Sequence, residues 1–437
     1  MEAAFKAHLE THFPEILLQP VLLACSGGLD SVVLAHLCAR LGVQATLAHC
    51  NFQLRGGESD GDQHFVEVLG KSLGIPVVCK TFQTREYLEE HGLSVQEGAR
   101  ELRYAWFETL LDAGRANFVL TAHHANDQLE TFLIHLGRGT GLDGLCGIPA
   151  RNGRVLRPLL LFTRERLEAY AQASGLTWRE DKTNAELEYL RNRYRHLVIP
   201  GLKAVVPEFP ERFQTTLTHL QGSRALVERY AGQLRESLFR EQEDGTHVLI
   251  KGLLELEPLQ PHLYALFQPY GFSDWPALER LLYGPAGKEV RSHTHRMLRG
   301  RESLILRLLE PKEKGVYEVD PEGGGTGLPL SLRFENVSEL GPTGPGILYA
   351  DRDALKQGLR LRKWKKGDYF YPLGLGGRKT ISKYFRDARQ SRFRKEDAWL
   401  LCSGEDVVWI IGHRADDRFK VTESTQNIWK ITCEAYE

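Results

Sequence analysis

The sequence has no long apolar run and no export signal. No stretch of about 18 apolar residues, the length that a helix needs to cross a bilayer, occurs in its 437 residues. The first residues, Met-Glu-Ala-Ala-Phe-Lys, lack the basic start, apolar core and small-residue cleavage site of a secretory signal. We therefore expect a cytoplasmic protein with no membrane attachment.

Cysteine is scarce and shows no pattern. The seven cysteines are scattered, and none forms a Cys-x-x-Cys pair. This spacing disfavours both a zinc site and a disulfide framework. A chain of this length is expected to hold two or three domains whose cores need neither.

The net charge of −1 hides a basic segment. Between Arg352 and Lys395 there are fifteen Lys and Arg residues but three Asp residues, a local charge of +12, so the rest of the chain carries −13. Such a segment indicates an anionic partner, usually a polyanion. Aromatic residues that could stack on RNA bases are interleaved with it: Trp364, Tyr369, Phe370, Tyr371, Tyr384, Phe385 and Phe393. The alternative is a small domain with an aromatic core and solvated basic side chains.

Up to about residue 150, short apolar segments alternate with amphipathic helical stretches. The expected strands are Val21–Cys25, Val43–His49, Ile75–Phe82 and Asn117–Ala122. The expected helices are Ser31–Leu41, Glu58–Leu73, Ser94–Ala113 and Asn126–Leu136. This alternation predicts an α/β fold, a doubly wound parallel sheet covered by helices on both faces.

Three domains are expected. Residues 1–206 form the α/β domain, and residues 207–314 are predicted to be a mainly helical central domain. A glycine run at 323–325 and nearby prolines indicate a boundary, so residues 315–437 are expected to form a small, basic α+β domain. Its expected elements are strands at Leu359–Trp364, Trp399–Leu401 and Val407–Gly412, and a helix near Ile381–Asp387.

The segment Ser26-Gly27-Gly28-Leu29-Asp30-Ser31 carries the strongest functional signal. It follows a strand and opens a helix, where glycines let the backbone turn sharply and aim N–H groups at anionic oxygens such as those of phosphate. It is neither a Walker A loop nor Gly-x-Gly-x-x-Gly, which disfavours ordinary kinases and dehydrogenases. The plain alternative is a glycine-rich turn in which Asp30 is the N-terminal acid of the helix.

Further polar side chains follow the second strand and lie on the third helix. The loop His49-Cys50-Asn51-Phe52-Gln53-Leu54-Arg55-Gly56 comes at a strand carboxyl end, where ligands of parallel sheets bind, unless its polar groups are simply solvated. Glu97, Arg100 and Arg103 share one helix face. That face is either a substrate contact or an exposed set of ion pairs.

The segment from Thr121 to Pro149 is the richest in polar groups. His123 ends the fourth strand, and Asp127 and Glu130 lie about one turn apart on a helix face, where two carboxylates can share Mg²⁺ or steer an amine. The glycines from 137 to 141 form either a helix C-cap or a loop that contacts substrate.

Together these motifs resemble a known enzyme family. Ser-Gly-Gly-x-Asp-Ser resembles the pyrophosphate loop of the N-type ATP pyrophosphatases, which split ATP into AMP and pyrophosphate to activate a substrate. The segments that narrow the resemblance to the tRNA(Ile)-lysidine synthetase family are 49–56, 94–104, 121–149, 157–160, 181–184, 191–195, 361–387 and 412–419. Gly98 replaces an alanine of the family and should weaken its helix slightly. Asn126 stands where many relatives have Asp, so Asn126 receives little catalytic weight.

The resemblance implies a ligase that uses ATP to adenylylate the wobble cytidine of the CAU anticodon of tRNA(Ile), and then joins free L-lysine to that base. Lysidine is formed, AMP and pyrophosphate are released, codon recognition changes from AUG to AUA, and amino-acid identity changes from Met to Ile. ATP is thus the co-substrate and Mg²⁺ the expected metal ion. The sequence leaves open whether the chain acts as a homodimer.

The resemblance also implies roles for individual residues. ATP and pyrophosphate are expected at Ser26, Gly27, Gly28, Leu29, Asp30, Ser31, His49 and Asn51. Catalytic roles are expected for Asp30, His123, Asp127 and Glu130, and Mg²⁺ at Asp30, Asp127 and Glu130. Substrate or tRNA contacts are expected from Arg55, Glu97, Arg100, Arg103, Arg138, Arg191, Arg195, Arg362, Lys363, Lys365, Lys366 and Lys383. The general base stays unassigned.

Two alternatives remain at this stage. A tRNA thiolase of the same superfamily would activate the base in the same way but deliver sulfur, and Cys50 and Cys146 are its candidate cysteines, although ordinary packing explains both. A non-catalytic RNA-binding protein that keeps a nucleotide fold would account for the basic segment alone.

Overall fold

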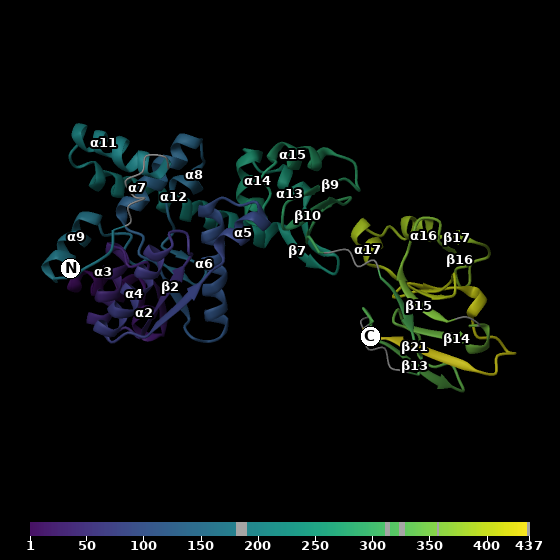
Figure 1. Ribbon diagram of the computed structural model, residues 1–437. Coiled ribbons are helices and arrows are strands. Elements are labelled where there is room, and N and C mark those ends of the chain that lie inside the picture. Colours follow the sequence, from purple (N-terminus) through teal and green to yellow (C-terminus); the bar gives the residue numbers. More distant parts are fainter. Residues whose placement is uncertain (181–189, 311–314, 323–327, 356–357, 435–437) are drawn as a thin grey trace. The chain divides into compact units, whose positions relative to one another are not determined.

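The structure, a computed structural model, describes residues 1–180, 190–310, 315–322, 328–355 and 358–434. The motif at 181–184 and the glycine run at 323–325 lie outside the described residues. The chain divides into two units, Met1–Leu226 and Val227–Glu437, and their elements are labelled in Figure 1. Within the described ranges, no helix is long and apolar enough to cross a membrane.

The centre of the first unit is a six-stranded sheet in the order β3-β2-β1-β4-β6-β5. The strands are β1 Val21–Ala24, β2 Ala45–Asn51, β3 Val77–Thr81, β4 Phe118–Leu120, β5 Arg151–Asn152 and β6 Val155–Leu156. Strands β1 to β4 are the four expected ones, and they pair in parallel, as β6 does with β4, while β5 is antiparallel to β6. The predicted doubly wound sheet is confirmed. Its order reverses between β1 and β4.

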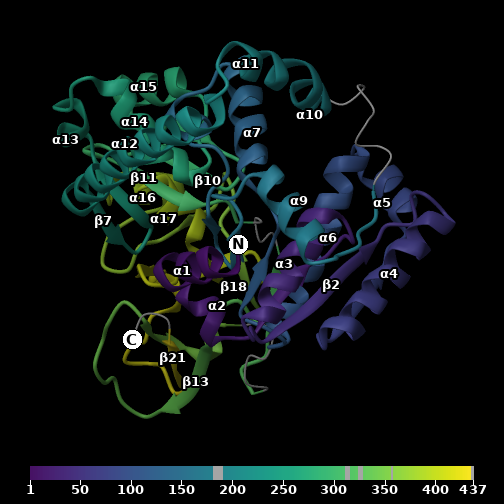
Figure 2. The same cartoon turned by 90° about the vertical axis from the view of Figure 1, so that its left-hand side faces the viewer.

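Helices cover both faces of this sheet (Figure 2). The helices of this unit include α1 Glu2–His12, α2 Pro14–Leu18, α3 Leu29–Arg40, α4 Gly57–Leu73, α5 Thr84–His91, α6 Val95–Asp112, α7 Ala125–Arg138, α8 Leu142–Leu145, α9 Arg164–Ala173, α10 Leu190–Arg193 and α11 Ile199–Val205, with the π-helix η2 Tyr194–Val198 between the last two. Leu23 of β1 packs with α1, α3, α4 and α9, whereas Leu22 packs with α6. Because successive strand residues point to opposite faces, β1 is apolar on both.

Residues 207–314, which lead into and form the first part of the second unit, are mainly helical, as expected, but they also contain a sheet that the sequence does not indicate. A five-stranded antiparallel sheet, in the order β7-β8-β11-β10-β9, lies among the helices. The elements are α12 Phe209–Leu238, β7 Phe239–Gln242, β8 Gly245–Leu249, α13 Ile250–Leu254, α14 Leu259–Phe267, α15 Trp275–Tyr283, β9 Glu289–Arg291, β10 His295–Arg299 and β11 Ser303–Leu308. Strand β10 lacks the alternation of a half-buried strand because Met297 and Leu298 are buried on opposite faces.

The rest of the second unit has the expected α+β character. Two sheets, β12-β15-β18-β19-β20 and β13-β21-β14, and the hairpin β16-β17 are joined by short helices. The elements are β12 Val316–Val319, β13 Leu332–Val337, β14 Ile347–Asp351, β15 Leu359–Lys363, β16 Tyr369–Phe370, β17 Lys379–Thr380, α16 Ile381–Asp387, α17 Arg392–Asp397, β18 Trp399–Ser403, β19 Asp406–Ile410, β20 Arg414–Ala415 and β21 Ile428–Cys433. The helix predicted near residues 381–387 is confirmed.

Candidate active site

The glycine loop lies between β1 and α3, as the sequence predicts. Gly27 has φ of +88°, in the left-handed region that favours glycine, and a Cβ there would come within 3.2 Å of the Phe65 ring. The Ser26 hydroxyl accepts the N–H of Gly28, the N-cap of α3, at 3.3 Å, and the Ser31 hydroxyl donates to the Gly28 carbonyl at 2.9 Å. These contacts shape the loop and leave backbone N–H groups at the start of α3 for anionic oxygens.

The other residues expected to bind ATP are largely buried beside this loop. His49 Nδ1 is hydrogen-bonded to the Cys25 carbonyl at 2.9 Å, and burial lowers the pKa of His49. Asn51 donates to Asp60 at 3.0 Å and to a glutamine of the same helix, α4. Leu29 packs into the core. His49 therefore ties β2 to the residue that precedes the loop, and Asn51 ties β2 to α4.

His124 lies between two of the expected catalytic acids. Its side chain is 2% exposed, and its Nε2 is 3.6 Å from Asp30 Oδ2 and 3.6 Å from Asp127 Oδ2. Burial opposes protonation, but the carboxylates of Asp30 and Asp127 outweigh it and raise the pKa of His124. Because β1 and β4 are neighbours, the loop after β1 and the start of α7 after β4 meet at this histidine.

Asp127 and Glu130 are paired with two arginines. Arg191 Nε is 2.6 Å from Glu130 Oε2, and Arg191 Nη2 is 2.9 Å from Asp127 Oδ1. Arg195 Nε is 2.6 Å from Glu130 Oε1. Glu130 is 1% exposed and has a guanidinium group on each oxygen. The pairing brings four expected site residues together and fixes α10 and η2 against α7.

His123 is held as a neutral side chain. Its Nδ1 is hydrogen-bonded to the Thr121 hydroxyl at 2.9 Å. Burial is the main cause that lowers the pKa of His123 to about 4, Asp127 acts in the opposite direction, and three arginines lower it further. The three are Arg157, Arg191 and Arg100. At neutral pH this ring can accept a hydrogen bond but carries no charge.

The three carboxylates differ in their fitness for Mg²⁺. Asp30 Oδ1 is buried and has no hydrogen-bond partner among the described residues. Asp127 accepts the backbone N–H of His124 at 2.9 Å besides pairing with arginine, and both oxygens of Glu130 are taken. Nowhere in the described ranges do three His, Cys, Asp or Glu side chains gather into a metal cage, but Mg²⁺ commonly takes one or two carboxylates together with phosphates and water. Asp30 therefore fits Mg²⁺, and Glu130 as placed does not.

Two further residues expected to contact substrate have structural partners. Arg55 Nη2 is 2.9 Å from Asp62 Oδ2. Glu97 forms a capping box with Ser94: the Glu97 carboxylate accepts the Ser94 N–H at 3.2 Å, and the Ser94 hydroxyl accepts the Glu97 N–H at 3.3 Å. The carboxylate of Glu97 thus stabilises the start of α6.

The remaining arginines of the first unit lie on aromatic rings or in solvent. Arg100 is exposed and stands 4.7 Å from the Tyr104 ring centre. Arg103 lies 5.5 Å from the ring centre of Phe52. Arg138 is exposed at the end of α7, where Gly139 is the C-cap with φ of +72°.

Some groups at this edge of the sheet had no role in the sequence-based expectation. His124 and Thr121 belong to the Thr121–Pro149 motif, but the motif alone does not say which side chain faces Asp30. Arg157, in the motif 157–160, is 4% exposed. Arg179 donates its backbone N–H to the Gly27 carbonyl at 3.0 Å and bonds to Asp62. No periodicity or spacing signals that last contact, because it depends on how the chain returns to the loop.

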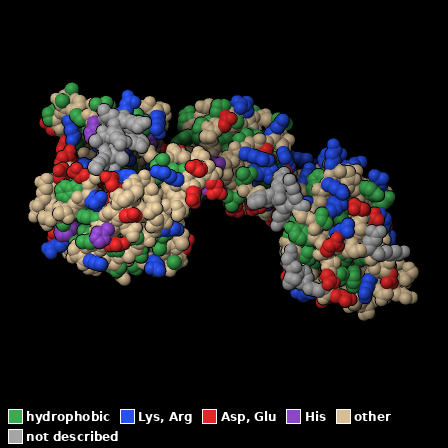
Figure 3. Space-filling model, in the orientation of Figure 1, with side chains coloured by type: hydrophobic (Ala, Val, Ile, Leu, Met, Phe, Trp, Pro, Cys, Tyr) green, Lys and Arg blue, Asp and Glu red, His purple; other side chains and the backbone are tan. Residues whose placement is uncertain are grey.

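The basic segment of the second unit divides into engaged and exposed cations. Arg362 is 8% exposed and makes two hydrogen bonds to Asp368, at 2.7 and 3.0 Å. Lys363 donates to the Asp397 carbonyl and lies 4.0 Å from the Trp399 ring centre. In contrast, the lysines expected to bind tRNA that are exposed are Lys365, Lys366 and Lys383, and the only one of these paired in the described ranges is Lys365, 3.8 Å from the exposed Glu405. Figure 3 shows Lys and Arg side chains gathered where α16 lies.

The aromatic side chains of this segment are not the stacking surface that the sequence predicts. The fully buried rings are Phe370, Phe385 and Phe393, and Trp364 and Tyr384 pack beside the first two. Tyr369 is half-buried, with the Arg378 guanidinium 3.8 Å from its ring centre. The alternative of an aromatic core with solvated cations therefore describes most of these rings.

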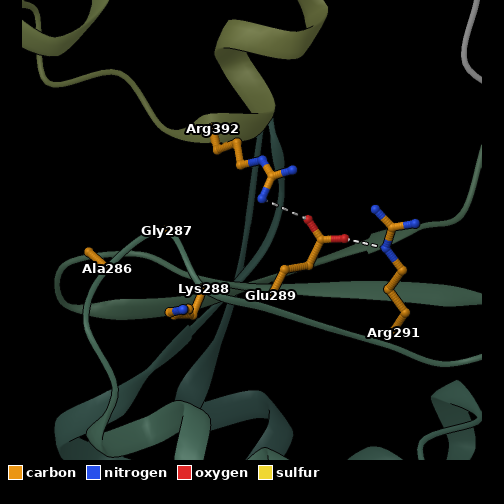
Figure 4. Close-up of a pocket in the computed structure, with 6 residues that line it drawn as sticks. All are labelled: Ala286, Gly287, Lys288, Glu289, Arg291 and Arg392. Carbon is orange, nitrogen blue, oxygen red and sulfur yellow. Dashed lines mark hydrogen bonds and ion pairs between the residues drawn. The ribbon is translucent and has the colours of Figure 1, made fainter.

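A shallow pocket in the second unit contains none of the expected site residues of the first. It is lined by Ala286, Gly287, Lys288, Glu289, Arg291 and Arg392. Figure 4 shows Glu289 in contact with both Arg291 and Arg392. Burial opposes ionisation, but hydrogen bonds from Arg296 and Arg291 outweigh it and lower the pKa of Glu289 to about 2. The pocket is thus built around a permanently charged acid.

A glycine loop where a parallel sheet reverses its order, with buried acids and cations beside it, fits the PP-loop class of ATP-using enzymes, and residues 1–202 match the PP-loop domain model. Residues 241–311 match the TilS substrate binding domain and residues 359–433 the TilS substrate C-terminal domain. The tRNA(Ile)-lysidine synthase of Parabacteroides distasonis is 38% identical, covering 94% of each chain, and that of Porphyromonas gingivalis W83 is 37% identical, covering 92% of this chain and 91% of the other. The chain belongs to the tRNA(Ile)-lysidine synthase family and is an ATP-dependent ligase.

The thiolase alternative is not supported. The solved structure of U34-tRNA thiolase NcsA from Methanococcus maripaludis with its [4Fe-4S] cluster covers 50% of this chain and 78% of its own, with a TM-score of 0.42 and 16% identity, which says nothing about function. Burial raises the pKa of Cys50 to about 12, and Cys146 is buried, so neither offers a reactive thiolate. Membership of the tRNA(Ile)-lysidine synthase family favours the ligase over the thiolase.

Proposed function

We propose that this chain adenylylates the wobble cytidine of the CAU anticodon of tRNA(Ile) with ATP and then joins L-lysine to that base, which releases AMP and pyrophosphate. The observation that carries the proposal is the meeting of the glycine loop, His124 and Asp127 where the sheet reverses its order. Membership of the lysidine synthase family supplies the substrates.

The first step is attack of the cytosine carbonyl oxygen on the α-phosphate of ATP. The backbone N–H groups of the glycine loop bind the departing pyrophosphate, whose charge grows as it leaves. Asp30, with its unpartnered oxygen, would hold Mg²⁺, which screens that charge. His124 fixes the carboxylate of Asp30 relative to Asp127.

The second step is attack of the lysine amine on the activated ring carbon, with AMP as leaving group. A free amine of this kind has a pKa of about 10.4, so it must first lose a proton to solvent water. His123, with a pKa of about 4, is too weak a base to hold that proton, because the transfer would be uphill by roughly 9 kcal/mol. We assign His123 to orienting the neutral amine and Asp127 to attracting its ammonium form.

Incubation of the full chain with ATP, labelled L-lysine and a CAU-anticodon tRNA(Ile) transcript tests the proposal. Label should enter the RNA in equal amount to the AMP formed. A transcript with uridine in place of the wobble cytidine is the matched control and should take up no label. ATP binding without incorporation of lysine into the RNA would contradict the proposal.

A further inference from the structure

Arg157 is a buried cation at the active edge of the sheet. It directly follows β6, and β6 is fixed beside β4 because the Thr121 N–H donates to the Leu156 carbonyl at 3.0 Å. Arg157 is 4% exposed. Its Nη1 donates to the Pro149 carbonyl at 2.8 Å, but its Nε has no hydrogen-bond partner among the described residues.

No carboxylate of the described chain forms an ion pair with Arg157, although burying a guanidinium group without an anion is costly. Burial lowers the pKa of Arg157, the Tyr104 side chain opposes this, and the positive charge of Arg100 lowers the pKa further. The contrast with Arg191 and Arg195 is clear, since both of those have carboxylate partners. The site beside His123 therefore has an excess of positive charge before substrate binds.

The geometry points to Arg157, with Arg100 beside it, as the binding site for the α-carboxylate of the amino-acid substrate. This inference rests on the proposed function, in which that substrate is L-lysine. A small carboxylate suits the burial of Arg157 better than a backbone phosphate does, because a phosphate belongs to a bulky polymer that cannot easily reach a side chain that is 4% exposed. The pyrophosphate of ATP has its own site in the glycine loop after β1, separated from Arg157 by β4.

The test compares Arg157→Gln with wild type on L-lysine and on L-lysinamide, which lacks the negative charge. Wild type should prefer lysine, and Arg157→Gln should raise the KM for lysine by about 10- to 100-fold, the loss of one charge-assisted hydrogen-bonding group. The KM for lysinamide should change by less than about threefold, and the KM values for ATP and tRNA should not change. The matched control is Arg154→Gln on the same hairpin, because the Arg154 side chain is 38% exposed and pairs with Glu108 and Asp112.

Equal effects of Arg157→Gln on lysine and lysinamide would overturn the inference, as would a selective rise in the KM for ATP or for tRNA, which would mean a phosphate occupant. If Arg157→Gln does not fold, Arg157→Lys keeps the charge but not the forked geometry. Arg157→Lys should then show a smaller rise in KM that is still confined to lysine. A rise in KM shared by lysine and lysinamide counts against the inference. Failure of wild type to incorporate lysine at all contradicts the proposed function instead.

Discussion

At the scale of single residues, Asp30 combines two features that the glycine loop alone does not explain. One carboxylate oxygen faces His124, and the other is buried without a hydrogen-bond partner among the described residues. An acid kept in this state has a free oxygen for a cation, and its position at the start of α3 places that cation beside the bound phosphates. We therefore expect the side chain to serve the chemical step rather than the fold.

Asp30→Ala should reduce tRNA-dependent AMP formation by at least about 100-fold, because removing charge stabilisation of a leaving group costs this much or more. Binding of tRNA, measured by filter retention, should stay within about twofold of wild type. The exposed Asp112→Ala, on α6, is the control for a general charge effect. Loss of tRNA affinity together with AMP formation would contradict the assignment.

His123 gives a residue-scale prediction about pH. The unfolded chain takes up a proton at this ring near pH 6.5, whereas the folded chain does so only near pH 4, so stability decreases as the pH falls from about 6.5 to 4. His123→Gln should remove this penalty and reduce the drop in unfolding free energy between pH 7 and 4.5 by roughly 1 to 2 kcal/mol, allowing for solvent screening. Urea titrations at both pH values measure it, with the exposed His64→Gln as control. An unchanged drop in His123→Gln would show that the ring is not held neutral.

At the scale of elements, helix α6 shows which features can be predicted from the sequence and which cannot. Its bounds are predicted to within a residue, because its apolar residues recur at helical spacing. The sequence indicates that Gly98 merely weakens this helix. In the structure a Cβ at that position would lie 2.3 Å from Leu88 Cδ2, so Gly98 lets α5 approach α6. Such an approach depends on tertiary packing, which helix propensity does not encode.

The same limit applies to the candidate site. The glycine loop and His123 are predicted because their signals lie within a few neighbouring residues. The pairing of Glu130 with Arg191 joins positions 61 residues apart, and nothing in either segment indicates its partner. The sheet of the central region escapes prediction for a related reason, since both faces of β10 are buried and its period is lost.

Around residue 365, the exposed cations that we expect to bind RNA are distinct from the cations that hold the fold. Lys365→Gln, Lys366→Gln and Lys383→Gln together should weaken tRNA binding. They should also lower the salt slope, the dependence of log affinity on log salt concentration, by about 0.7 to 0.9 for each phosphate that is no longer neutralised.

Arg362→Gln should instead lower the unfolding free energy by about 3 kcal/mol, because it leaves Asp368 buried without its partner. Affinities at several salt concentrations and denaturant titrations measure the two effects. The division fails if Arg362→Gln lowers the salt slope without loss of stability.

At the scale of the whole chain, α17 fastens the last part of the second unit to the central sheet. Phe393 is fully buried between Leu298 and Ile305. The guanidinium groups of Arg296 and Arg307 lie over its ring, 4.7 and 5.8 Å from the centre. The ring thus combines apolar contacts with cation–π contacts.

Ion pairs surround that ring. Arg296 is 2.8 Å from Glu396 on α17, and Arg392 of α17 is 3.6 Å from Glu289 of the central sheet. Part of the +12 charge counted from the sequence is therefore engaged within the chain. The local charge of the segment overestimates what it offers to RNA, because helix α17 uses its cations to join two parts of one unit.

Phe393→Ala should consequently lower the unfolding free energy of the second unit by about 3 to 5 kcal/mol, the cost of emptying a fully packed aromatic site. Calorimetry of the full chain should show a lower melting temperature for the transition of this unit and an unchanged transition for the first unit. Arg386→Ala, exposed on α16 in the same basic segment, is the matched control and should leave both transitions in place. Because the ring is the one apolar group that α17 contributes to the Leu298–Ile305 cluster in the described structure, an unaltered melting profile for Phe393→Ala would mean that the ion pairs alone fasten the helix.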